Sequence, residues 1–175
     1  MTPDTLKRIY PQATAANLTR FAPLLTAAMA EFNINTPGRQ AAFVAQIGHE
    51  SGQLRYVEEI ASGAAYEGRK DLGNTQPGDG KRFKGRGLIQ ITGRENYAAA
   101  TMALDIDVLN HPELLAEPAN AARSAAWWWA DHGLNELADD GPANFRAITR
   151  KINGGLNGIE DREQLYARAR SVLGV

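Results

Sequence analysis

The chain contains no cysteine. It therefore has neither disulfide bonds nor a thiolate zinc site. This absence says nothing about its compartment, because oxidising compartments permit disulfides without requiring them. A surplus of charge of one sign is also lacking, since 19 basic and 20 acidic residues leave a formal net charge of −1. This balance argues against a nucleic-acid binder held by a basic face.

Long hydrophobic runs are missing as well. No window approaches the roughly 18 apolar residues of a membrane span, and the first eight residues hold no apolar stretch of a signal peptide. We therefore expect a protein made in the cytoplasm, without stable membrane insertion, that another factor must release. The chain of 175 residues can bury a sizeable core, so we expect one domain over residues 1–175.

Apolar residues recur at helical spacing through most of the chain, which predicts a mainly α protein. Glycine and polar residues dominate between residues 52 and 87, and they break long helices. Two β-rich pieces, 54–60 and 83–91, frame this stretch, so we predict a small antiparallel sheet beside the helical body. Helices are expected over residues 3–10, 17–32, 37–51, 93–104, 119–137, 142–153 and 158–173.

Glu50 is the most informative residue of the chain. Phe43, Ile47 and Glu50 follow a spacing that places them on one helix face, and that face is otherwise apolar. Gly52 ends the helix, so Glu50 lies in its last turn. Apolar neighbours and the negative end of the helix dipole both disfavour the ionised form of a carboxyl group there. A carboxyl group that keeps its proton can act as a general acid.

Glycoside hydrolysis requires a second carboxyl group. After Glu50, the candidates are Glu58, Glu59 and Glu67. Glu58 and Glu59 would point to opposite faces of a strand, so only one of them can face a cleft. Glu59 lies beyond the helix end and can face Glu50 across a groove. The alternative, that these are solvated acids of a loop, stays open on the sequence alone.

Two other motifs are considered as cofactor sites, and neither has the spacing that a zinc site or a phosphate-binding loop requires. A zinc metalloprotease helix needs a second histidine where this chain has Gln53, so we interpret His49 as structural, with the further option that it orients a carboxylate. The basic run 81–87 lacks the spacing of a phosphate-binding loop. It fits either an exposed hairpin arm or a wall for a polar polymer, and Arg86 within it could neutralise a catalytic carboxylate.

Thr92 has two interpretations that do not exclude each other. Residues 92–95 read as a helix capping box, in which the Thr92 hydroxyl is the N-cap acceptor. The same hydroxyl could hold an attacking water. The three consecutive tryptophans at 127–129 point in three directions on a helix, and we interpret them as core residues.

Four motifs follow one another along the chain: His49-Glu50-Ser51-Gly52, the segment Gly80–Thr92, Asn96-Tyr97, and Ile152-Asn153-Gly154-Gly155. Together they resemble glycoside hydrolase family 19, which holds chitinases and the chitinase-like endolysins of bacteriophages. The resemblance extends from about Phe32 to Leu173. It implies a lysozyme-like, mainly helical fold with a small antiparallel β-lobe flanking the active-site cleft. It also implies an inverting enzyme that uses neither a metal nor an organic cofactor.

The resemblance assigns roles residue by residue. Glu50 matches the general acid. Glu59 matches the general base of the endolysin branch, where the second glutamate follows at the same spacing, and Thr92 matches the residue that helps to position the water. Polar residues that line the substrate groove are matched by Gln90, Asn96 and Asn153. Arg162 matches an arginine that supports the acidic pair.

We therefore predict an endolysin that hydrolyses the β-1,4 bonds between N-acetylmuramic acid and N-acetylglucosamine in peptidoglycan. Inversion needs room for a water, so the two carboxyl groups should lie about 6.5–9.5 Å apart. The expected partners are peptidoglycan glycan strands and a holin that opens the path to the wall, and we expect a monomer. Two alternatives stay open: a chitinase of the same mechanism, and a non-catalytic glycan-binding module.

Overall fold

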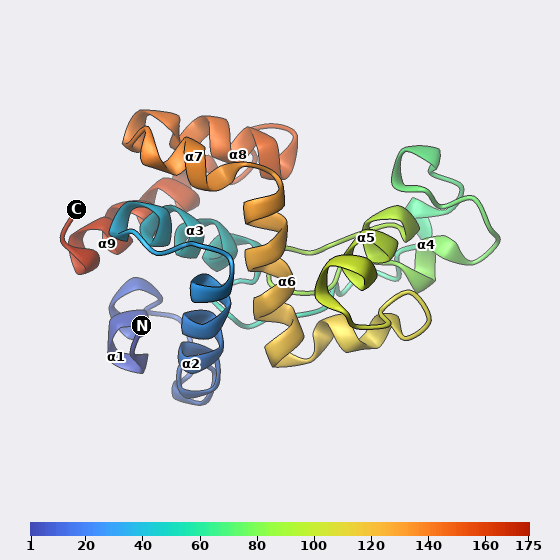
Figure 1. The fold of residues 1–175 in the computed structure, drawn as a ribbon, viewed down its shortest axis with the longest axis horizontal. Coiled ribbons are helices and arrows are strands. Elements are labelled where there is room, and N and C mark those ends of the chain that lie inside the picture. Colours follow the sequence, from blue (N-terminus) through green and yellow to red (C-terminus); the bar gives the residue numbers. More distant parts are fainter.

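The computed structural model describes residues 1–175, and nearly all of its regular structure is helical (Figure 1). None of these helices combines the length and the apolar character that a membrane span requires. The α-helices are α1 (Pro3–Ile9), α2 (Ala15–Glu31), α3 (Pro37–Glu50), α4 (Asp79–Arg82), α5 (Arg94–Leu104), α6 (Pro118–Asp131), α7 (Leu134–Asp139), α8 (Phe145–Asn153) and α9 (Ile159–Leu173). The 3₁₀ helices are η1 (Ala64–Tyr66), η2 (Lys70–Leu72), η3 (Pro112–Ala116) and η4 (Pro142–Asn144).

Helix α3 lies at the centre of the helical body. The Thr36 side chain caps its start, accepting from the Arg39 backbone N–H at 3.2 Å, and every residue from Ala41 to Gly48 is buried. Helices α3 and α9 pack along each other, and α2 packs on α6. In Figure 1, α6 runs between this body and a region that holds α4 and α5. The helix that ends at Glu50 is thus confirmed, and it is buried along most of its length.

The predicted antiparallel sheet is wrong. Residues 54–60 and 83–91 make only two isolated bridges, Glu58 with Arg86 and Arg86 with Ile91. The backbone leaves the extended region at Leu54 and at Gln90, where φ is +69° and +60°, so no ladder can extend. Residues 52–93, here called the glycine-rich lobe, are instead folded by turns and the short helices η1, η2 and α4.

The predicted helix over residues 119–137 is two helices. Helix α6 ends at Asp131 and α7 begins at Leu134, because Gly133 between them adopts a left-handed φ of +64°. Asn135 holds this corner: its Oδ1 accepts from the Trp129 Nε1 at 3.0 Å and its Nδ2 donates to the Phe32 carbonyl at 3.1 Å. The break therefore turns the chain back over α3.

The predicted capping box at residues 92–95 is wrong. The N-cap of α5 is Gly93, with φ +95°, and the Thr92 hydroxyl donates to the Gln90 carbonyl at 2.9 Å instead of accepting from the helix. The N-cap of α9 is Gly158. A side chain at Gly158 would collide with the His49 ring, since a Cβ would lie 2.2 Å from its Cε1. Close packing between elements thus decided both helix starts.

Candidate active site

Glu50 is held from the side by a buried arginine. Its side chain is 18% exposed, and Arg162 Nη2 donates to its Oε1 at 2.5 Å. The Arg162 side chain is fully buried, with 0% exposed. The predicted apolar neighbours Phe43 and Ile47 are buried as expected, whereas the ion pair with Arg162 is a contact that helix periodicity did not reveal. Arg162 thus joins the start of α9 to the end of α3.

Gln46 extends this contact into a network. Arg162 Nη1 donates to Gln46 Oε1 at 2.5 Å, and Gln46 Nε2 donates to Thr149 Oγ1 at 2.8 Å. The Thr149 hydroxyl donates in turn to the Phe145 carbonyl at 3.1 Å. Gln46 and Thr149 are both fully buried, and a satisfied buried network of this kind is rigid. The sequence signal that could have revealed Gln46 is a polar residue one turn before Glu50 on a buried helix.

Glu59 is held by two hydrogen bonds, one on each oxygen. The Tyr66 hydroxyl donates to Oε1 at 3.0 Å, and the Gly85 N–H donates to Oε2 at 3.1 Å. Its backbone is fixed as well, because its N–H donates to the Gly85 carbonyl at 2.9 Å and its own carbonyl accepts from Lys84 Nζ at 3.0 Å. Burial and the bond to Glu59 raise the pKa of Tyr66, so its hydroxyl stays a donor. Glu59 is therefore half-buried and oriented.

The other two candidate bases have different partners. Glu58 is exposed and forms ion pairs with Arg86, 3.1 Å from its Nη2, and with Lys84, 3.2 Å from its Nζ. Arg86 therefore neutralises Glu58, the neighbour of the proposed base. The Glu67 carboxylate accepts from the N–H groups around the start of α4, those of Gly78 at 2.7 Å and Gly80 at 2.8 Å. Through these contacts Glu67 stabilises the start of α4.

A cavity of about 160 Å³, called the Thr92 cavity below, is lined by two of the three predicted groove residues and by the predicted water-positioning residue Thr92; the third groove residue, Asn153, is not among its lining residues. It brings Gln90, Thr92 and Asn96 together. A Cβ on Gly85 would lie 2.8 Å from Gln90 Oε1 and 3.2 Å from Glu59 Oε2, so this glycine lets both oxygens approach the backbone. The residues that line the Thr92 cavity are Leu72, Ile89, Gln90, Ile91, Thr92, Asn96, Trp128 and Ile152.

Helix α8 connects this cavity to the Glu50 network. Ile152 lines the cavity and lies one turn after Thr149, which contacts Gln46. Asn153, the last residue of α8, follows directly; its Oδ1 is buried and has no hydrogen-bond partner in the protein. The same helix thus braces the Glu50 network and contributes to the cavity wall.

His49 is a structural link, as interpreted from the sequence. Its Nδ1 lies 2.7 Å from Asp161 Oδ2, and its ring packs on the backbone of Gly158. The contact joins the end of α3 to the first turn of α9. The His49 side chain contacts the carboxylate of Asp161 and forms no hydrogen bond or ion pair with Glu50 or Glu59, so these contacts do not support a role in orienting either candidate catalytic acid.

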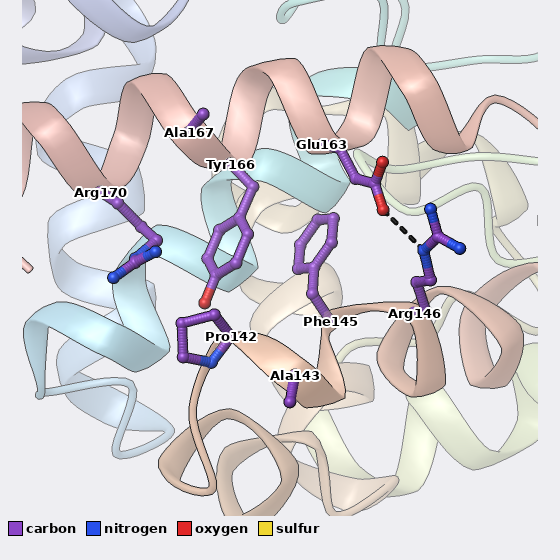
Figure 2. Close-up of a pocket in the computed structure, with 8 residues that line it drawn as sticks. All are labelled: Pro142, Ala143, Phe145, Arg146, Glu163, Tyr166, Ala167 and Arg170. Atoms are coloured by element: carbon purple, nitrogen blue, oxygen red, sulfur yellow. Dashed lines mark hydrogen bonds and ion pairs between the residues drawn. The ribbon is translucent and has the colours of Figure 1, made fainter.

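A second cavity, of about 350 Å³, lies between η4, α8 and α9 (Figure 2). The rings of Phe145 and Tyr166 stack there with centroids 4.1 Å apart, and Arg146 Nε lies 2.8 Å from Glu163 Oε1. Its one acid is thus already paired, and none of the residues predicted for the active site lines it. We take the Thr92 cavity as the candidate substrate site because it gathers Gln90, Thr92 and Asn96, although Glu50 and Glu59 are not among its lining residues.

Comparisons with known proteins identify the family. A family model described as chitinase class I, of glycoside hydrolase family 19, matches residues 13–140. A glycosyl hydrolase family 19 domain-containing protein of Haemophilus influenzae is 35% identical over 160 residues, which cover 73% of this chain and 76% of that protein. An endochitinase of Arabidopsis thaliana is 38% identical over 141 residues, which cover 77% of this chain and 48% of that protein. The chain thus spans about half the length of this plant relative.

The crystal structure of a bacterial family 19 chitinase is similar over the whole fold, with a TM-score of 0.80 and 29% identity. The match covers 99% of this chain and 95% of that one. The chain therefore belongs to glycoside hydrolase family 19 and is a glycoside hydrolase. The mainly helical, lysozyme-like fold expected from the motifs is confirmed, without the β-lobe.

Proposed function

We propose that this enzyme is an endolysin that hydrolyses the β-1,4 bonds of peptidoglycan by an inverting mechanism. The observation that supports it most is the placement of two oriented carboxyl groups on separate segments. Glu50 ends a buried helix and is held by Arg162, whereas Glu59 belongs to the glycine-rich lobe and is held by Tyr66 and Gly85. Inversion requires two such groups about 6.5–9.5 Å apart, and this separation stays a prediction.

The reaction divides between the two acids. Glu50 gives its proton to the glycosidic oxygen as the bond between that oxygen and the anomeric carbon breaks. A water attacks the opposite face of the anomeric carbon, and Glu59 takes a proton from it. The product is a reducing end of inverted configuration. The chemistry then needs only this chain, the glycan and the water.

Thr92 suits the task of holding that water. Its hydroxyl hydrogen is committed to the Gln90 carbonyl at 2.9 Å, so its oxygen lone pairs remain to accept from a water. The hydroxyl lines the cavity instead of capping α5. A threonine in this arrangement orients a water through an acceptor, which leaves the attacking oxygen of the water free.

Peptidoglycan is the substrate that we propose first, because the motifs of this chain resemble those of the endolysin branch of the family. Glu59 follows Glu50 by the nine residues that the endolysin branch uses. Chitin is the second candidate, and the endochitinases among the relatives favour it. Both glycans carry N-acetylated sugars joined by β-1,4 bonds, so the same two carboxyl groups would serve for either. We further propose a single-domain monomer over residues 1–175 that reaches the wall from the cytoplasm through a holin-made opening.

Mass spectrometry of digested peptidoglycan tests the proposal. Fragments that end in reducing muramic acid are expected from the wild-type enzyme and should be absent with Glu50→Gln. A parallel digest of chitin oligosaccharides measures the competing activity. Release of chitin fragments with intact peptidoglycan would replace the endolysin proposal with the chitinase. Reducing glucosamine ends or cleaved peptides from peptidoglycan would contradict the proposed bond.

A further inference from the structure

Three consecutive tryptophans in α6 have different surroundings. Trp129 is 0% exposed; its Nε1 bonds Asn135 and its ring meets the edge of Phe43 with centroids 5.5 Å apart. Trp127 is also buried, with 8% exposed. Trp128 is half-buried, and its side chain lines the Thr92 cavity. The core interpretation therefore holds for two of the three, and Trp128 faces the candidate site.

His132 fixes the Trp128 side chain in place. The imidazole stacks on the indole with centroids 3.7 Å apart and an interplanar angle of 18°. Its Nδ1 lies 2.8 Å from the Trp128 carbonyl, one helical turn back, and because a carbonyl can only accept, Nδ1 carries the hydrogen. His132 thus covers one face of the indole, and Trp128 also lines the Thr92 cavity.

The polar side chains of the cavity offer acceptors. Gln90 Nε2 donates to the Gly87 carbonyl at 2.9 Å, and Asn96 Nδ2 donates to the Thr92 carbonyl at 2.8 Å. Carbonyl partners fix both amide orientations, so Gln90 Oε1 and Asn96 Oδ1 are the atoms left without a partner in the protein. The Thr92 hydroxyl likewise donates its hydrogen to a carbonyl, that of Gln90. All three side chains therefore donate to backbone carbonyls, and the oxygen of each remains available to accept a hydrogen bond from a ligand.

A ligand that fits this arrangement must bring donors and an apolar face together. The remaining lining is aliphatic, with Leu72, Ile89, Ile91 and Ile152. A pyranose ring has an apolar C–H face and hydroxyl donors at its edges, and an acetamido group adds an N–H donor. The volume of about 160 Å³ is below the roughly 300 Å³ at which drug-sized sites begin, so it suits part of one sugar unit and not an oligosaccharide.

We propose that Trp128, braced by His132, is the platform on which one N-acetylated sugar unit of the substrate packs. Hydroxyl and amide donors of that sugar then bind the oxygens of Gln90, Asn96 and Thr92. The inference rests on the proposed function for its substrate class and goes beyond it by assigning a residue that neither the motifs nor the family match singles out. Trp128 is a specificity-determining residue in this reading, because it discriminates by shape and apolar contact.

Steady-state kinetics on soluble N-acetylglucosamine oligosaccharides and peptidoglycan fragments test the platform. Trp128→Ala should raise KM about 5–20-fold while kcat stays within about twofold, because a stacking contact mainly supports binding. Trp128→Phe should fall between this variant and the wild type. His132→Ala removes only the brace and should raise KM about two- to threefold. Circular dichroism and thermal melts establish that each variant is folded.

Tryptophan fluorescence gives a readout that a purely structural role would not move. N-acetylglucosamine oligosaccharides should change the emission of the catalytically disabled Glu50→Gln enzyme, and Trp128→Phe in that background should abolish the change. Trp127→Phe is the matched control and should preserve it. Cello-oligosaccharides, which lack the acetamido group, should bind at least several-fold more weakly.

The two proposals fail differently. A folded Trp128→Ala enzyme with an unchanged KM would overturn the platform and leave the hydrolase function intact. An oligosaccharide-induced emission change that survives Trp128→Phe would do the same. A wild-type enzyme that cleaves neither glycan would overturn the proposed function, whereas the fluorescence titration would still decide whether Trp128 binds an N-acetylated sugar.

Discussion

Arg162 Nη2 lies 2.5 Å from Glu50 Oε1, although the two residues are 112 positions apart in the chain. The same guanidinium bonds Gln46 Oε1 and the Asn157 carbonyl, so its plane cannot turn. Glu50 is therefore oriented by α9 and not by its own helix. A change in α9 that moved Arg162 would alter the acid as directly as a change in α3.

Replacing Glu50 with glutamine should remove hydrolysis and preserve the fold. The amide oxygen can still accept from Arg162, so the network loses little, whereas general acid catalysis contributes roughly 10²–10⁴-fold. Lysis of permeabilised cells and release of reducing ends should fall by this factor. Glu163→Gln is the control: this glutamate lies in α9 next to Arg162 but pairs with Arg146, and the variant should retain wild-type rates. A Glu50→Gln enzyme within tenfold of the wild type would remove this residue from the mechanism.

Arg162→Ala should unfold more easily than any surface variant. It leaves Gln46 Oε1 and a carboxyl group without their buried partner, and breaking a buried pair typically costs about 3–5 kcal/mol. Urea denaturation measures the loss. Arg162→Lys keeps a charge but cannot make three fixed bonds, so it should recover part of the stability and less of the kcat. Equal free energies of unfolding for the wild type and Arg162→Ala would mean that the network does not stabilise the fold.

Glutamine variants of the three candidate bases should differ in kcat and in melting temperature when they are assayed in parallel. Glu59→Gln is expected to lower kcat by roughly 10²–10⁴-fold without loss of stability. Glu58→Gln removes the ion pairs of an exposed carboxylate with Lys84 and the buried Arg86, and it should change kcat by less than about threefold. Glu67→Gln loses a charged acceptor at the start of α4 and should lower the melting temperature more than the rate. If Glu67→Gln alone lost activity, the groove would run along the other side of the lobe.

Tyr66→Phe should loosen the orientation of the Glu59 carboxylate without removing that carboxylate. One of the two donors to the Glu59 carboxylate disappears, and a bond to a charged group is worth about 1.5–3 kcal/mol, so kcat should fall roughly 10–100-fold. The pKa of Tyr66 is raised by burial and by Glu59. A raised tyrosine pKa favours the neutral form in the folded state, so this contribution persists to pH 10 and fades above it. A pH–rate profile of the variant that matches the wild type in height would exclude this role.

The pair of Asp79 and Arg94 should make the glycine-rich lobe sensitive to acid. Arg94 hydrogen bonds hold the pKa of Asp79 below its usual value of 3.8, and the Asp79 side chain is 2% exposed. The folded state therefore favours the carboxylate, which stabilises the protein above about pH 4 and is lost as pH falls below that. Asp79→Asn should cost about 1–3 kcal/mol near neutral pH and flatten the acid dependence of thermal melts.

A surface acid provides the comparison for that experiment. Asp71 pairs with Arg69 in the same lobe, but both side chains are largely exposed. Asp71→Asn should leave the melting temperature unchanged at every pH. A similar loss in both variants would show that net charge, and not the buried pair, sets the acid sensitivity.

Local signals determined most of the helices. The sequence predicted a helix over residues 37–51; apolar spacing predicted its buried face, and Gly52 predicted its end, which the structure places at Glu50. These signals act within a few residues, so the sequence reveals them directly. The predicted sheet failed because β-rich composition does not report φ, and the positive φ values at Leu54 and Gln90 stop any ladder.

The sequence by itself determined the helical class, the position of Glu50 at a helix end, and the motifs that led to the family. Only the tertiary structure decided which residues touch. Gln46 and Arg162 meet across 116 positions, and no periodicity within either helix foretells that contact. Trp128 lines the cavity while its neighbours are buried, because the helices packed around α6, α2 above all, determine which direction is left open.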